Sequence, residues 1–207
     1  MSWEIWAAYA LACGVLLAIP GPTILLVISY SLREGRSAAG WLTAGVVLGD
    51  LAAMVISLSG MGLLLSVSST LFSLMKWIGA AYLVYLGVRM WFSPPVQVAD
   101  RLPAVRGAGP KLLGHAFLVT LFNPKGITFF LAFFPQFLDR ASPLWPQLII
   151  LGSTFLVLGC INAATYALLA GSARVAMQNP VWQKVLNRTG GGFLITAGVY
   201  TSTLQRG

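Results

Sequence analysis

The chain has little charge and few of the side chains that bind metals or cross-link a fold. Only 9% of its 207 residues are charged, five are acidic, one is histidine and two are cysteine. A metal site needs several Asp, Glu, His or Cys ligands, and an enzyme inside a membrane needs paired catalytic groups. The composition therefore disfavours metal-binding proteins, disulfide-stapled folds and intramembrane enzymes.

Hydrophobic residues make up 57% of the chain, and the mean hydropathy is +0.82. A membrane-spanning helix needs about 20 mostly apolar residues. Six stretches meet this requirement, at about 4–31, 38–65, 71–92, 113–138, 145–171 and 185–204. The sequence therefore predicts an all-α integral membrane protein with six transmembrane helices, which leaves almost no length for a soluble domain.

The net charge of +8 predicts an orientation in the membrane and not a nucleic-acid partner, because the basic residues are scattered at the ends of the spans. If the loops alternate sides, nine basic residues fall on one face and three on the other, with Lys125 left out as intramembrane. Positive residues favour the cytoplasmic side, so the face with nine basic residues is predicted to be cytoplasmic. We therefore expect both termini outside.

Two proline motifs interrupt apolar stretches that would otherwise form continuous helices. They read Pro20-Gly21-Pro22 and Asn123-Pro124-Lys125. Because proline has no N–H, these motifs would leave the carbonyls of Leu16, Ala18 and Thr120 without helical partners. Broken backbone survives in a bilayer only where protein buries it or where it lines a cavity. We expect a binding cavity at the breaks; a plain proline kink is the alternative.

The chain also contains an internal repeat. The segment 76–87 aligns with 187–198, because small residues, an aromatic and two glycines eight apart coincide. This predicts two three-helix repeats, 1–92 and 113–207, joined by a proline-rich cytoplasmic linker at 93–112. Three is odd, so the second repeat enters the membrane from the opposite side, and the two form an inverted pair with helices 1 and 4 broken.

Asp50 is the only acid deep inside a predicted span, and Lys125 is the complementary base. Intramembrane charges are costly and are functional candidates by default. Burial disfavours the charged form of an acid, so Asp50 is a candidate proton carrier. We expect Asp50 to take a coupling proton or to pair with a substrate ammonium, unless it is a structural partner of Lys125. Lys125 holds a substrate carboxylate, neutralises Asp50 or extends to the cytoplasmic surface.

Helix termini and polar side chains complete the predicted site. The half-helices after Pro22 and Pro124 present free N–H groups, which suit a carboxylate. Asn162, Thr165 and Tyr166 are the polar cluster of the fifth span, and either line the same cavity or bond to a neighbouring helix. The predicted substrate-binding residues are Pro20, Gly21, Pro22, Thr23, Asp50, Asn123, Pro124, Lys125, Asn162 and Tyr166.

Four motifs in order along the chain resemble the RhtB family of the LysE superfamily, whose members export amino acids. They are Pro20-Gly21-Pro22-Thr23, Gly45 to Gly49-Asp50, Lys76 through Gly79-Ala80-Ala81-Tyr82-Leu83 to Gly87, and Asn123-Pro124-Lys125 with Phe129-Phe130 and Pro135-Gln136-Phe137. The resemblance covers essentially the whole chain. The position that would mirror Gly49-Asp50 in the second half reads Gly159-Cys160, without a carboxylate.

The resemblance implies a bacterial inner-membrane protein that extrudes amino acids or close derivatives using the proton gradient. The inverted repeat is an architecture that many secondary transporters use for alternating access, and we expect no cofactor. With one deep acid, a cationic side chain has no second counter-charge. We therefore expect small neutral substrates such as threonine, homoserine, homoserine lactone or leucine. The alternatives are an exporter of a cation or metal ion and, further off, an intramembrane enzyme. Aromatic faces and small-residue stripes are compatible with a homodimer.

Overall fold

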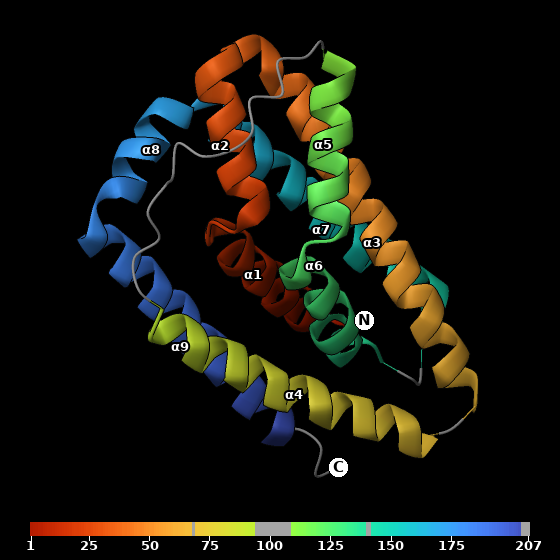
Figure 1. Cartoon of the computed structure of the whole chain (residues 1–207). Helices are drawn as coiled ribbons and strands as arrows, with labels where there is room; N and C mark the ends of the chain where they lie inside the picture. Colours follow the sequence, from red (N-terminus) through yellow and green to blue (C-terminus); the bar gives the residue numbers. More distant parts are fainter. Residues whose placement is uncertain (68, 94–108, 140–141, 204–207) are drawn as a thin grey trace.

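The computed structural model describes residues 1–67, 69–93, 109–139 and 142–203, and every regular element in these ranges is helical. Figure 1 shows α1 and α6 near the centre of the helical assembly, with α4 and α9 running together along one side. This all-α arrangement of apolar helices confirms the predicted fold class. The predicted linker at 93–112 lies mostly outside the described residues, and its last residues belong to α5.

The first predicted span is two helices that meet at the first proline motif. They are α1 (Trp3–Ala18) and α2 (Pro22–Glu34), bent by 54°. The fourth span breaks in the same way at the second motif, between α5 (Gly109–Leu121) and α6 (Pro124–Thr128). A π-helix, η2 (Phe129–Phe133), and a 3₁₀ helix, η3 (Phe134–Phe137), continue it, with a bend of 44° at the break. Both breaks lie where the prolines predicted them.

The other predicted spans correspond to long helices. These are α3 (Ala39–Val67, after the short 3₁₀ helix η1, Arg36–Ala38), α4 (Ser69–Trp91), α7 (Leu144–Leu168) and α9 (Pro180–Thr203). Within the described residues, two helical segments, 36–59 and 144–168, are long and apolar enough to cross a membrane. The number rises to as many as four if each of the two bent pairs, α1 with α2 and α5 with α6–η3, counts as one span. The six-span count and the inverted repeat therefore stay predictions.

One helix was not expected. The chain turns after α7 at Leu169, whose backbone leaves the helical region, and α8 (Ala170–Gln178) begins at the next residue. Asn179 then caps α9 through its side chain, which accepts from the N–H of Val181. The predicted fifth span ended at 171, because α8 continues the same small-residue composition without a proline or a charge run to mark the turn.

Glycines let the helices approach closely at two contacts. Gly45 and Gly49 are buried where α3 packs on α5, and a Cβ at Gly49 would lie 2.7 Å from the carbonyl oxygen of Phe117. Gly87 of α4 faces α9, where a Cβ would lie 2.6 Å from the Gly191 carbonyl oxygen and 2.7 Å from Cγ1 of Ile195. The hydrophobic effect does not drive helices together within a membrane. Small residues favour association there because they permit close van der Waals packing of the backbones.

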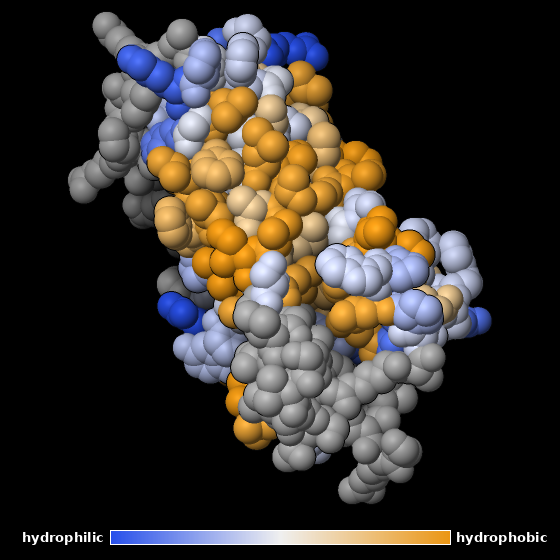
Figure 2. Space-filling model, turned by 90° about the vertical axis from the view of Figure 1, so that its right-hand side faces the viewer, coloured by the Kyte–Doolittle hydropathy of each residue, from blue (hydrophilic) through white to orange (hydrophobic). Residues whose placement is uncertain are grey.

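The outer surface of the helices is apolar. Figure 2 shows hydrophobic side chains gathered over the middle of one face, with hydrophilic ones toward its upper end. Ile56 of α3 and Ile161 of α7 are 65% and 58% exposed. Soluble proteins rarely present such a continuous apolar surface, whereas a protein surrounded by lipid must. The long apolar helices and this surface are those of a multi-pass membrane protein.

The glycine contact between α4 and α9 predicts a stability difference between two Gly→Ala variants. Gly87→Ala introduces a methyl group against backbone of α9 and should lower the free energy of unfolding by about 1–3 kcal/mol. Gly14→Ala is the matched control, because nothing lies within 4 Å of a Cβ there. It should raise stability by up to about 1 kcal/mol through helix propensity alone. Thermal unfolding in detergent measures both, and equal midpoints would contradict the close α4–α9 contact.

Candidate functional site: a cavity between two broken helices

The first break is built by the two prolines around Gly21. Helix α1 ends at Ala18, and Ile19 adopts an extended backbone because Pro20 cannot supply the next helical N–H. Gly21 is the N-cap of α2 and Pro22 is its first residue, where a missing N–H costs nothing. The C-terminal end of α1 and the N-terminal end of α2 therefore meet at the same place, one with free carbonyls and the other with free N–H groups.

The second break is organised by Asn123. Its side-chain oxygen accepts from the N–H of Lys125 at 3.1 Å and so caps α6, and its backbone N–H donates to the carbonyl of Thr120 at 3.0 Å. The carbonyl that Pro124 was expected to orphan is therefore paired. The amide Nδ2 of Asn123 donates to Oγ1 of Thr23 at 2.9 Å. This hydrogen bond joins the second break directly to the first.

Lys125 pairs the carbonyls at the end of α1. Its ammonium donates to the carbonyl oxygen of Leu16 and, at 2.7 Å, to that of Ile19. The ammonium therefore lies at the negative end of the α1 dipole, where a cation is stabilised. Its acceptors are backbone atoms at the opposite break, which none of the three roles predicted for Lys125 included.

Tyr166 pairs the other carbonyl that the proline motif was expected to orphan. Its hydroxyl, on α7, donates to the carbonyl oxygen of Ala18 at 2.8 Å. The predicted polar cluster of the fifth span thus divides. Asn162 lines the cavity, Tyr166 bonds to a neighbouring helix, and Thr165 bonds back to the carbonyl of Ile161 at 2.7 Å within its own helix.

Asp50 is buried, with 8% of its surface exposed, and its carboxylate lies between two glycines of other helices. A Cβ on Gly159 of α7 would lie 3.4 Å from Oδ2, and one on Gly126 of α6 would lie 3.9 Å from Oδ1. Asp50 and Lys125 attract each other electrostatically, although Lys125 gives its hydrogen bonds to carbonyls. The carboxylate therefore faces a cavity and not a hydrogen-bonded ion pair, and the ammonium of Lys125 lies near it.

These groups surround one cavity of about 40 Å³, which is room for two or three water molecules. Six of the ten predicted site residues line it, together with apolar side chains. The lining is Leu16, Leu17, Gly21, Thr23, Ile24, Val46, Asp50, Asn123, Lys125, Gly126, Phe155, Gly159 and Asn162. Pro20, Pro22 and Pro124 shape the breaks without being part of this lining. Tyr166 also lies outside the lining and acts on the site through its hydrogen bond to Ala18 of α1. The cavity combines one negative group, one positive group and amide and hydroxyl donors.

One polar contact near the site was not expected. The hydroxyl of Tyr30, on α2, lies 2.8 Å from Nδ1 of His115, on α5. His115 has no partner at ligand spacing in the sequence, so the sequence carries no signal for this contact. The contact links the second half of the first broken span to the first half of the fourth, on the far side of the breaks from α1.

Cation ligands are sparse among the residues that the structure describes. No three His, Cys, Asp or Glu side chains come together there as a metal site, and Cys13 and Cys160 are free thiols on separate helices. Cys13 is buried, whereas Cys160, the residue that would mirror Asp50, is exposed at the surface of α7.

The sequence also matches a known protein family. A family model described as LysE type translocator matches residues 14–204. The chain belongs to the LysE-type translocator family. The predicted resemblance to the RhtB branch is confirmed, and the chain is a membrane transporter and not an enzyme.

Three relatives indicate the range of this family. A homoserine/homoserine lactone efflux protein of Salmonella typhi is 33% identical over 205 residues, which is 99% of each chain. An uncharacterized membrane protein of Vibrio cholerae is 32% identical over 206 residues, covering 99% of this chain and all of that one. A leucine efflux protein of Klebsiella pneumoniae is 28% identical over 134 residues, which is 65% of this chain and 63% of that protein. No solved structure matches the chain.

The hydrogen bonds of Lys125 predict a stability role. Lys125→Met removes the side-chain donor of both carbonyls. The Leu16 carbonyl keeps the N–H of Ile19 at 3.3 Å, whereas the Ile19 carbonyl is left unpaired, at a cost of about 1–3 kcal/mol. Lys184→Met, on the exposed face of α9, is the control and should change stability by less than about 0.5 kcal/mol. Thermal unfolding in detergent compares the two. If Lys125→Met unfolds at the same temperature as Lys184→Met, the ammonium does not hold the end of α1.

Proposed function

We propose that this chain exports amino acids or close derivatives by alternating access, coupled to the proton gradient across the bacterial inner membrane. The observation that supports this most directly is the cavity between the two breaks, with Asp50 and Lys125 both in its wall. A zwitterionic amino acid carries one ammonium and one carboxylate. The names of the homoserine and leucine efflux relatives point to the same class of solute.

In this proposal the substrate carboxylate meets the positive side of the cavity. An ammonium has three donors, and Lys125 uses two for the carbonyls of Leu16 and Ile19. The third is free to meet a carboxylate, beside the N-terminal end of α2, where Thr23 lines the cavity. The N-terminus of a helix favours an anion. The N-terminus of α6 contributes less to binding the carboxylate, because Asn123 already caps it.

The substrate ammonium meets Asp50, and the coupling proton competes for the same carboxylate. On the cytoplasmic side, where protons are scarce, Asp50 is ionised and binds the ammonium. On the outer side, a proton binds Asp50 and releases the solute. One carboxylate that accepts either a proton or an ammonium, but not both, is sufficient for antiport. The glycines at 126 and 159 leave this carboxylate open to the cavity.

A cavity of this size cannot enclose a whole amino acid, so binding must widen it. We expect α6 to move away from the first break, where Lys125 binds the end of α1 and Asn123 binds Thr23 of α2. Small neutral solutes such as threonine, homoserine, homoserine lactone or leucine fit a site with one acid and one base, because neither charge is left for a charged side chain.

Efflux from proteoliposomes tests the role of Asp50. Vesicles are loaded with labelled homoserine, threonine or leucine, and efflux is followed with and without an imposed pH gradient. Asp50→Asn should lower the gradient-driven rate roughly ten- to a hundredfold, because a charge-assisted hydrogen bond contributes about 1.5–3 kcal/mol.

Glu34→Gln provides the matched control for this experiment. It neutralises an exposed acid at the end of α2 and should export at the wild-type rate. Gradient-driven efflux that survives Asp50→Asn would rule out the shared-carboxylate mechanism, and no efflux of any amino acid by the wild type would rule out the function itself.

The charge distribution predicts that both termini lie outside the cytoplasm. Alkaline phosphatase, which is active only outside the cytoplasm, should be active when fused to the C-terminus and inactive when inserted between residues 100 and 101 in the predicted linker. A reporter that folds only in the cytoplasm should give the reverse result. The opposite pattern for both reporters would contradict the predicted orientation of the chain.

A further inference from the structure

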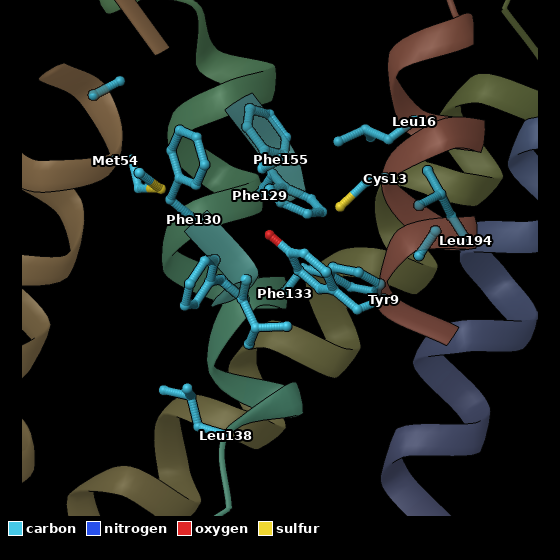
Figure 3. Close-up of a cluster of buried hydrophobic side chains, with 14 residues drawn as sticks. Tyr9, Cys13, Leu16, Met54, Phe129, Phe130, Phe133, Leu138, Phe155 and Leu194 are labelled. Carbon is cyan, nitrogen blue, oxygen red and sulfur yellow. The ribbon is translucent and has the colours of Figure 1, made fainter. Parts of the chain in front are cut away.

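Beside the cavity lies a cluster of buried aromatic rings that the proposed mechanism does not use. Phe155 of α7 lines the cavity and stacks on Phe129 of η2, with ring centroids 5.1 Å apart. Phe133, Phe134 and Tyr9 continue the cluster away from the cavity and are 0–1% exposed. Figure 3 shows these rings filling the space between α1 and the segment from α6 to η3. The cluster closes the cavity on the side of the N-terminal half of α1.

Tyr9 differs from the other rings because it carries a hydroxyl. The residue is completely buried, and its oxygen has no hydrogen-bond partner other than the thiol of Cys13. The rings of Phe129, Phe134 and Phe137 pack around the Tyr9 ring, with centroids 5.2–6.1 Å from its own. The polar group next to it is the thiol of Cys13, one helical turn further along α1, and a thiol is a weak hydrogen-bond partner. A buried hydroxyl without a partner lowers stability, and phenylalanine would fill the same space without that cost.

The hydroxyl lies behind the aromatic rings on one side of the cavity. Tyr9, Cys13 and Leu16 share one face of α1, because they are spaced four and three residues apart, and Leu16 lines the cavity. In Figure 3 the oxygen of Tyr9 points toward Phe129, whose ring separates it from Phe155. One layer of rings therefore stands between this hydroxyl and the cavity wall.

The segment that carries these rings is the irregular part of the fourth span. Phe129 and Phe133 belong to the π-helix η2, between the short helix α6 and the 3₁₀ helix η3. Such irregular helical turns often occur at functional sites. A shift of this segment away from α1 would uncover the Tyr9 hydroxyl to a solute leaving the cavity.

We propose that the hydroxyl of Tyr9 is a second solute-binding group, which the solute meets after Asp50 and Lys125 when α1 and η2 separate. A phenol both donates and accepts, so it selects solutes with a hydroxyl or carbonyl oxygen on the side chain, such as hydroxy-amino acids and their lactones. This inference rests on the proposed export function and adds a specificity determinant to it. Asp50 and Lys125 hold the part common to all amino acids, and Tyr9 distinguishes their side chains.

Two solutes of the same shape test this proposal. Homoserine and norvaline differ in one position, where homoserine has a hydroxyl and norvaline a methyl group. Efflux of both labelled solutes from proteoliposomes gives the ratio of their kcat/KM values. Tyr9→Phe removes only the hydroxyl and should lower the homoserine-to-norvaline ratio about three- to tenfold, which is the range of one hydrogen bond between neutral groups.

Tyr85→Phe is the control, because that tyrosine lies on the exposed face of α4. It should leave the ratio unchanged. A second readout separates function from structure: since a thiol is the weak and sole hydrogen-bond partner of the Tyr9 hydroxyl, Tyr9→Phe should unfold at the wild-type temperature or above it.

Each other outcome contradicts the proposal in a recognisable way. An equal fall in both solutes, or no change, means that the hydroxyl does not select. A lower unfolding temperature means that it has a structural partner. If the wild type exports amino acids while Tyr9→Phe keeps the ratio, only this inference fails; if the wild type exports none, the proposed function fails with it.

Discussion

The structure depends on how the carbonyl groups at the end of α1 are paired. Two prolines end this helix inside an apolar assembly, where an unpaired carbonyl is costly. Lys125 pairs Leu16 and Ile19, and Tyr166 pairs Ala18. Satisfying one broken helix thus fixes α6 and α7 around it. The cavity forms in the space that remains between them.

The two intramembrane charges are held in different ways, and this difference suits them to different tasks. The ammonium of Lys125 is anchored on backbone at the negative end of a helix, where its charge is stabilised and its position is fixed. The carboxylate of Asp50 faces glycines and open space, so it is free to change partner. A cation held in place beside an exchangeable anion gives the site polarity without locking it into one bound state.

Local chemistry predicted the breaks and the depth of Asp50, because proline and an isolated charge act on their own residues and need no knowledge of neighbours. Tertiary pairing was not accessible in the same way. The acceptors of Lys125 lie 109 and 106 residues away, and the partner of Tyr166 lies 148 residues away. Helix α8 was missed because no proline marks the turn at Leu169, and the π-helical turn was missed because Pro135 follows it and marks only its end. The contact between Tyr30 and His115 was missed because it joins two spans that the sequence keeps apart.

The pairing of the first break has a consequence for biosynthesis. Residues 16–23 enter the membrane early, but the side chains that satisfy them, at 123, 125 and 166, are translated about 100 residues or more later. Until then the first half holds unpaired carbonyls that the translocation machinery, lipid headgroups or water must solvate. The hydrogen bonds of the first helix pair, α1 and α2, are therefore complete only after the second half of the chain has been made and has supplied these side chains. Separated halves of this chain should depend on each other to assemble.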